Sequence, residues 1–127
     1  MNGNLFLRTS VLFLMAGLAL GMFMGSHEDF TQVPVHVHLN LVGGVWMFLA
    51  GLFYNAHPHL SRKAMAAHYG CAIVGMPLFA AGLWGAAIQA KWFLPFVITG
   101  SSLSTLALVI FAVLVFIGTG KTPSQAV

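Results

Sequence analysis

Apolar residues follow one another in four long stretches, and charged residues occur only between them. The uncharged stretches cover residues 9–27, 30–61, 64–90 and 92–120. Each is long enough for the about 20 residues that an α-helix needs to cross a hydrocarbon core of about 30 Å. The pattern predicts four transmembrane helices over residues 5–25, 34–56, 65–89 and 92–118, with errors of about four residues at each end.

The composition supports the same fold class. Only five Lys or Arg and two Asp or Glu occur in 127 residues, and 59% of the residues are hydrophobic, whereas about a quarter of the residues of a soluble domain are charged. The stretches also lack the in-out alternation of membrane-barrel strands. We therefore expect an all-α membrane protein in which residues 1–127 form a single domain, a four-helix transmembrane bundle surrounded by lipid.

The positions of the basic residues predict how the chain is oriented in the membrane. Arg8, Arg62, Lys63 and Lys121 fall on one side, and Lys91 alone falls on the other. Because cytoplasmic loops carry the excess of Lys and Arg, we expect both termini in the cytoplasm and a multi-pass protein of the cell (inner) membrane. The positive net charge follows from this topology, so no nucleic-acid partner is expected.

Six histidines are unexpected in so apolar a chain, because polar side chains at membrane depth are costly and usually face a protein interior, a cavity or a ligand. They form two sets at opposite ends of the expected second helix. One set is His27, His36 and His38, and the other is His57, His59 and His68. Roughly 30 Å of helix separates the sets, so one mononuclear site cannot use both.

His36 and His38 belong to the first turns of the expected second helix, which begins at Pro34. Two residues that are two positions apart on an α-helix differ in direction by about 200°, so the two rings point to nearly opposite faces. His36 shares its face with small and polar residues, which indicates a packed interior, whereas His38 shares its face with apolar residues. The first face holds Asn40, Gly43, Met47, Gly51 and Tyr54, and the second holds Val42, Val45, Leu49 and Leu52.

Residues 38–58 resemble the second transmembrane helix of the catalytic subunit of haem-copper oxidases, especially the C-type oxidases and the nitric oxide reductases. The similar features are an H-x-N start at His38 and Asn40, a middle rich in glycine and aromatic residues, and a terminal Tyr54 followed by Pro58. Residues 36–43 also look like a signature of small stand-alone relatives of that subunit. By this resemblance, His38 would be an axial ligand of a haem b.

The resemblance implies haem binding without oxygen or nitric oxide reduction, since the copper ligands of that family come from helices that this chain lacks. His36, Asn40 and Gly43 would belong to the same cofactor site. A second axial ligand would come from the same side of the membrane, and the candidates are His27, Met22, Met24 or the His38 of a neighbouring copy. A four-helix unit has little room to enclose a haem, so we expect a homo-oligomer or a subunit of a larger membrane complex.

A copper or zinc ion is the alternative cofactor, because imidazoles, thioethers and carboxylates are ligands of these ions. The candidate ligands near residue 30 are Met22, Met24, His27, Glu28, Asp29, His36 and His38. At the other end, His68 could face Tyr54 or join His57 and His59 in a metal cluster. A purely structural accessory subunit of a membrane enzyme complex is a further alternative.

No complete catalytic constellation occurs in the sequence, because the only two carboxylates are adjacent and motifs for nucleotide binding or nucleophilic catalysis are missing. Whether the chain is an enzyme stays open, and any activity would be part of an oxidoreductase. The sequence therefore predicts a haem b-binding membrane protein for electron transfer or gas binding, acting alone or in a respiratory or oxidative complex. Metal binding and electron transport are the expected properties.

Overall fold

The structure is a computed structural model that describes residues 2–120, and this part of the chain contains helices and no strand. The first span is α1 (Asn4–His27). The second consists of three consecutive segments, α2 (Val33–His38), η1 (Leu39–Trp46) and α3 (Met47–Ala56), and the third and fourth are α4 (Arg62–Ala87) and α5 (Phe93–Thr119). The four expected helices are confirmed, and their ends differ by at most three residues, as at Arg62 where residue 65 was expected.

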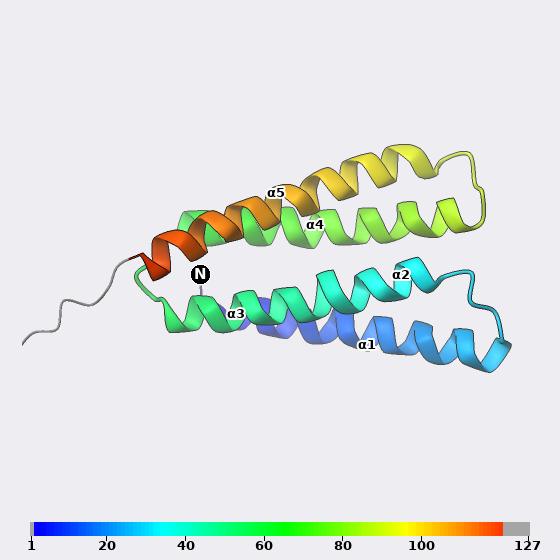
Figure 1. Ribbon diagram of the computed structural model, residues 1–127, viewed down its shortest axis with the longest axis horizontal. Coiled ribbons are helices and arrows are strands. Elements are labelled where there is room, and N and C mark those ends of the chain that lie inside the picture. Colours follow the sequence, from blue (N-terminus) through cyan, green and yellow to red (C-terminus); the bar gives the residue numbers. More distant parts are fainter. Residues whose placement is uncertain (1, 121–127) are drawn as a thin grey trace, which may run out of the picture.

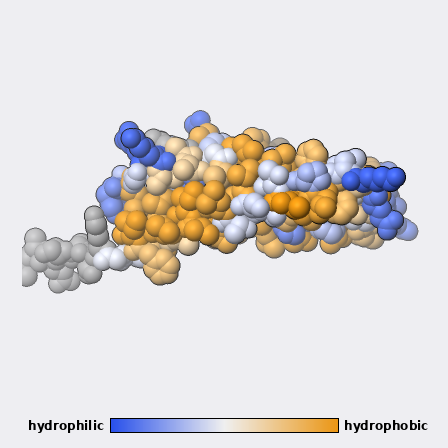
Figure 2. Space-filling view, turned by 90° about the horizontal axis from the view of Figure 1, so that it is seen from above, coloured by the Kyte–Doolittle hydropathy of each residue, from blue (hydrophilic) through white to orange (hydrophobic). Residues whose placement is uncertain are grey.

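All four spans are long and apolar enough to cross a membrane, so the chain is a multi-pass membrane protein. Large apolar side chains point outward along every span; Leu12 is 66% exposed, Met15 62% and Phe116 78%. In Figure 2 the hydrophobic colour covers the middle of the bundle, and the hydrophilic colour gathers towards its two ends. Such an apolar surface suits lipid, and helices are the elements that can form their backbone hydrogen bonds within the span, where lipid offers no partners.

The spans form two antiparallel hairpins that lie side by side (Figure 1). The first hairpin pairs α1 with the second span, and the other pairs α4 with α5. We call the end with residue 2, residue 120 and the loop 57–61 the terminal end, and the end with the loops 28–32 and 88–92 the far end. Lys121 and the rest of the tail, which entered the orientation prediction, lie outside the described residues.

The α4–α5 hairpin is held by glycines that let the two backbones touch. A Cβ atom at Gly100 would run into the backbone of Phe79, and one at Gly82 would run into the backbone of Val97. Small residues at such crossings are how membrane helices pack, since lipid gives no hydrophobic drive for helices to associate. Pro95 lies in the first turn of α5, where its missing N–H costs nothing, and Pro77 lies inside α4 without ending it.

The two hairpins share a core near the terminal end. The ring of Phe6 on α1 lies 5.0 Å from the ring of Tyr54 on α3 and 4.9 Å from the ring of His68 on α4. Phe111 on α5 adds a contact to His68, with ring centroids 5.5 Å apart. All four spans therefore meet around one buried histidine, which fixes the hairpins relative to each other at this end.

The second span changes helix type in its middle. Within η1 the hydrogen bonds reach five residues back, and such π-helical segments are frequent at functional sites. The pair Gly43 and Gly44 lies in this segment, and a Cβ atom at either would crowd Phe13 or Leu14 of α1. The wider turn puts residues four apart on one face, so Trp46 takes the place beside His38 and Val42 that the α-helical projection gave to Val45.

Candidate cofactor-binding groove

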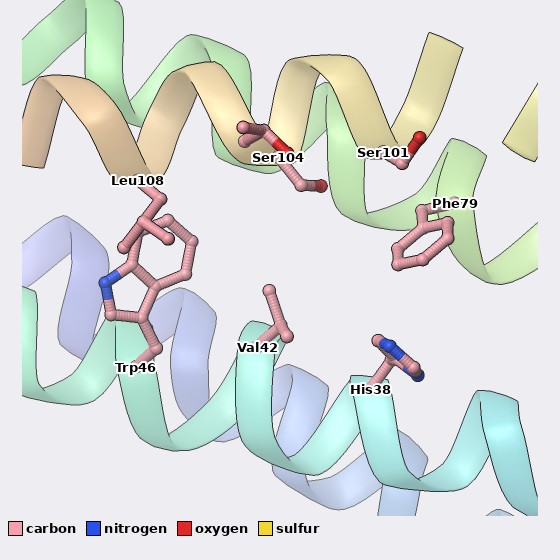
Figure 3. A pocket seen from close by; sticks show the side chains of 8 residues that line it. His38, Val42, Trp46, Phe79, Ser101, Ser104 and Leu108 are labelled. Atoms are coloured by element: carbon pink, nitrogen blue, oxygen red, sulfur yellow. The ribbon is translucent and has the colours of Figure 1, made fainter. Parts of the chain in front are cut away.

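A partly open groove of about 370 Å³ lies between the two hairpins, on the side of the shared core that leads towards the far end. Both hairpins contribute to it, one from α2 and η1 and the other from α4 and α5. The groove is mainly apolar, with one imidazole and three hydroxyl groups. Its lining residues are His38, Val42, Trp46, Phe79, Ser101, Ser104, Thr105 and Leu108. Figure 3 shows the His38 ring projecting from its helix into the gap between the hairpins.

The orientation of His38 is fixed by its own helix. Its Nδ1 lies 2.7 Å from the carbonyl oxygen of Pro34, one turn earlier. Because a carbonyl oxygen can only accept, Nδ1 of the neutral ring donates and Nε2 keeps its lone pair. Phe79 meets the ring edge-on, with centroids 4.9 Å apart. His38 therefore offers one unprotonated nitrogen at a groove wall, in a ring that is held on both sides.

Hydroxyl groups of α5 form the facing wall. Ser101, Ser104 and Thr105 are spaced so that they share one helical face, together with Leu108 one turn later. Ser101 Oγ donates to the carbonyl of Ile98 at 3.2 Å, whereas Ser104 Oγ is buried and has no hydrogen-bond partner. The sequence showed these hydroxyls but gave no reason to place them opposite His38, because that depends on how the hairpins pack.

His36 turns away from the groove and fastens the second span to α1. Its Nδ1 donates to the carbonyl oxygen of Gly17 at 2.8 Å, and a Cβ atom at Gly21 would come within 2.7 Å of its Cε1. Asn40 Nδ2 donates to the carbonyl oxygen of His36 at 2.9 Å, and Gly43 packs on Phe13 of α1. The prediction that these residues face a packed interior is confirmed, and the structure separates them from the groove.

The other residues proposed as ligands near residue 30 lie on α1 or just after it, and none lines the groove. Met22 is 69% exposed on the outer face of α1, while Met24 is buried at the C-terminal part of that helix. The His27 ring packs on Phe23 and its Nδ1 lies 2.9 Å from that residue's carbonyl oxygen. Like His38, His27 therefore bonds through Nδ1 to the carbonyl oxygen four residues earlier, but it lies at an exposed helix end.

The two carboxylates belong to the exposed loop at the far end. Glu28 ends α1 in a left-handed conformation with φ of 52°. Asp29 Oδ1 accepts hydrogen bonds from the hydroxyl and the backbone N–H of Thr31, at 2.6 and 3.0 Å. These bonds, led by the one from the side chain, lower the pKa of Asp29 below its ordinary value. The acid group is therefore used in shaping the loop.

His68 lies near the terminal end and is fully buried. Of the two arrangements considered for His68, the structure has the contact with Tyr54, whose hydroxyl lies 2.6 Å from His68 Nδ1. The rings of Phe6, Trp46 and Phe111 surround the imidazole at centroid distances of 4.9, 5.3 and 5.5 Å. Its Nε2 has no hydrogen-bond partner.

The two remaining histidines lie apart from His68, in the loop at the terminal end. The His57 ring stacks on Phe53 and its Nδ1 bonds to the Phe53 carbonyl oxygen at 2.8 Å, while the exposed His59 ring lies 5.8 Å from that of His57. Across residues 2–120, the structure brings together no group of three His, Cys, Asp or Glu side chains that could hold a metal ion.

Comparison of the chain with protein-family models, with curated proteins and with solved structures found no match. The likeness of residues 38–58 to an oxidase helix therefore remains a prediction from the sequence.

Proposed function

We propose that this membrane protein binds haem b in the groove between its hairpins, with Nε2 of His38 as an axial ligand of the iron. The supporting observation is the His38 ring itself, which lines the groove while its Nδ1 donates to the Pro34 carbonyl oxygen. Metal-binding histidines commonly donate their second ring nitrogen in this way, because the bond fixes the tautomer and the ring orientation.

The groove has the size and lining that such a cofactor needs. Its volume of about 370 Å³ falls in the range of about 300–1,000 Å³ found for small-molecule and cofactor sites. Its walls are mostly apolar, and a porphyrin face is apolar too. The groove is only partly closed, so we also propose that a second copy of the chain or a partner subunit covers its open side.

The chain supplies position and shielding. Val42 and Leu108 present hydrocarbon on the two walls, and Phe79 holds the edge of the imidazole. Trp46 closes the groove towards the shared core, where its ring contacts His68. When bound, the haem would supply one-electron chemistry or the binding of a small gas. The residues that ligate the iron and the groups that face it would determine which of these two functions the haem has.

The proposal also includes the orientation in the membrane. Arg8, Arg62 and Lys63 lie at the terminal end, and Lys91 lies in the loop 88–92 at the far end. We therefore assign the terminal end to the cytoplasm of a cell (inner) membrane. The haem would lie towards the outer side, and electron partners would approach from there.

The test is an absorption spectrum of the protein purified in mild detergent after expression with ample haem. The unaltered protein should show a haem Soret band, and His38→Ala should lose it or retain haem much more weakly. His57→Ala is the matched control, because His57 makes the same bond to a carbonyl one turn earlier but lies outside the groove. A protein without a Soret band, or equal spectra for both variants, would rule out haem ligation by His38.

A further inference from the structure

The two walls of the groove differ in chemistry. His38 projects from the wall formed by α2 and η1, and the facing wall of α5 carries Ser101, Ser104 and Thr105. Figure 3 shows this arrangement, with His38 on the lower helix and the two labelled serines on the upper one. A flat cofactor bound by His38 would therefore have an imidazole on one face and hydroxyl groups on the other.

The facing wall offers no strong ligand for a second axial position. Neutral hydroxyl groups of Ser and Thr are weak ligands of haem iron, whose usual axial ligands are His, Met, Cys thiolate and Tyr. The residues that could have filled this role are elsewhere, since Met22 is exposed on α1, and Met24 and His27 do not line the groove. Within the described chain, His38 is the only strong haem ligand in the groove.

Ser104 stands out among the hydroxyl groups. Its Oγ is buried without a hydrogen-bond partner, whereas Ser101 satisfies its hydroxyl on its own helix at Ile98. A buried polar group without a partner is unusual and calls for an explanation such as an absent ligand. The backbone there is fixed by close packing, because a Cβ atom at Gly75 of α4 would lie 2.9 Å from the Ser104 nitrogen.

We infer that the groove is a binding site for a small diatomic gas, in which His38 holds the haem iron as its single protein ligand and Ser104 donates a hydrogen bond to the gas on the facing side. The inference rests on the proposed haem site and specifies what that site does. Hydrogen-bond donors and steric access on the side opposite the protein ligand decide whether a haem binds a gas or only transfers electrons. Apolar gases dissolve in lipid, so a partly open groove between transmembrane helices gives them a direct path.

Carbon monoxide is the probe for this inference. In the reduced, haem-loaded protein we expect a five-coordinate, high-spin spectrum and a large Soret shift when carbon monoxide is added. Ser104→Ala should move the C–O stretching band of the complex to higher wavenumber, because the hydrogen bond that weakens the C–O bond is lost. Ser102→Ala is the matched control, since Ser102 is an exposed serine of the same helix outside the groove.

The outcomes separate the two proposals. A bound haem that is six-coordinate and low-spin when reduced, and that does not take up carbon monoxide, would overturn the gas-binding inference while leaving the haem site in place. The inference would also fail if Ser104→Ala and Ser102→Ala gave the same C–O band as the unaltered protein. A preparation without any haem band would overturn the haem site and the gas-binding inference together.

Discussion

The Tyr54 hydroxyl and the His68 imidazole form a hydrogen bond of 2.6 Å in the most buried part of the bundle. Tyr54 belongs to the first hairpin and His68 to the second, so this bond joins the two halves of the molecule across their shared core. Phe6, Trp46 and Phe111 pack around the imidazole. Nothing else in the described structure offers His68 a hydrogen-bond partner.

Tyr54→Phe should therefore lower the stability of the bundle. The substitution keeps the ring but leaves both nitrogens of a buried histidine without a partner, which costs about 1–3 kcal/mol. The measurement is the midpoint of thermal unfolding in detergent, followed by circular dichroism. Tyr69→Phe is the control, because the Tyr69 hydroxyl bonds at 2.8 Å to the Thr9 hydroxyl, which can instead turn to a carbonyl group of its own helix. The loss of stability in Tyr69→Phe should therefore be smaller. Equal decreases of the unfolding midpoint in the two variants would show that the Tyr54–His68 bond stabilises the bundle no more than the Tyr69–Thr9 bond does.

His36→Ala should keep the haem and weaken the first hairpin. The ring of His36 bonds to the Gly17 carbonyl and packs on Gly21, away from the groove. Removing it leaves a void between α1 and α2, so we expect a Soret band that is retained or slightly shifted, and a lower unfolding temperature. If His36→Ala abolished the haem spectrum while His38→Ala left it normal, the two histidines would have to exchange roles.

The glycine crossing of α4 and α5 should tolerate no side chain. At Gly100 an added methyl group meets the backbone of Phe79, and neither helix can yield locally. Gly100→Ala should then cost about 1–3 kcal/mol through overpacking. Gly70→Ala on α4 has open space around it and should leave the midpoint of thermal unfolding unchanged or raise it. Equal midpoints for the two variants would contradict the close crossing.

The assigned orientation can be tested with single cysteines in a Cys71→Ala background. Ser26→Cys places a thiol at the exposed far end, and His59→Cys places one in the exposed loop of the terminal end. In intact cells a membrane-impermeant maleimide should label the first variant and leave the second unlabelled until the cells are permeabilised. The reverse pattern would exchange the two ends and move the groove to the cytoplasmic side.

The sequence predicted the four spans well, because lipid allows little else. A run of apolar residues without charges has to become a helix of fixed minimum length, and that requirement does not depend on the neighbours of the run. The contact between Tyr54 and His68 was also predictable, since both residues flank one short turn. These are properties of single helices and of their nearest connections.

The groove was not predictable in the same way. Phe79 and Ser104 become neighbours of His38 only through the packing of one hairpin against the other, and sequence periodicity describes one helix at a time. The π-helical turns of η1 also shifted the register, so that Trp46 faces the groove where an ideal α-helix would have placed Val45. The prediction for His36 succeeded because it precedes those turns and depends only on its contact with α1.

The π-helical segment sets how far the two ends of the second span are rotated relative to each other about the helix axis. Each residue of an α-helix turns the chain by about 100°, and each residue of the wider π-helical turns rotates it by less, so converting Leu39–Trp46 to an α-helix of the same length would rotate one end of the span against the other. His38 could then keep its place in the groove only if Tyr54 swung away from His68, or the reverse. Substitutions at outward positions such as Leu41 and Val45 leave this rotation untouched, whereas a change from π-helical to α-helical turns alters it, so the helix type of the segment is what couples the alignment of the groove to that of the buried pair.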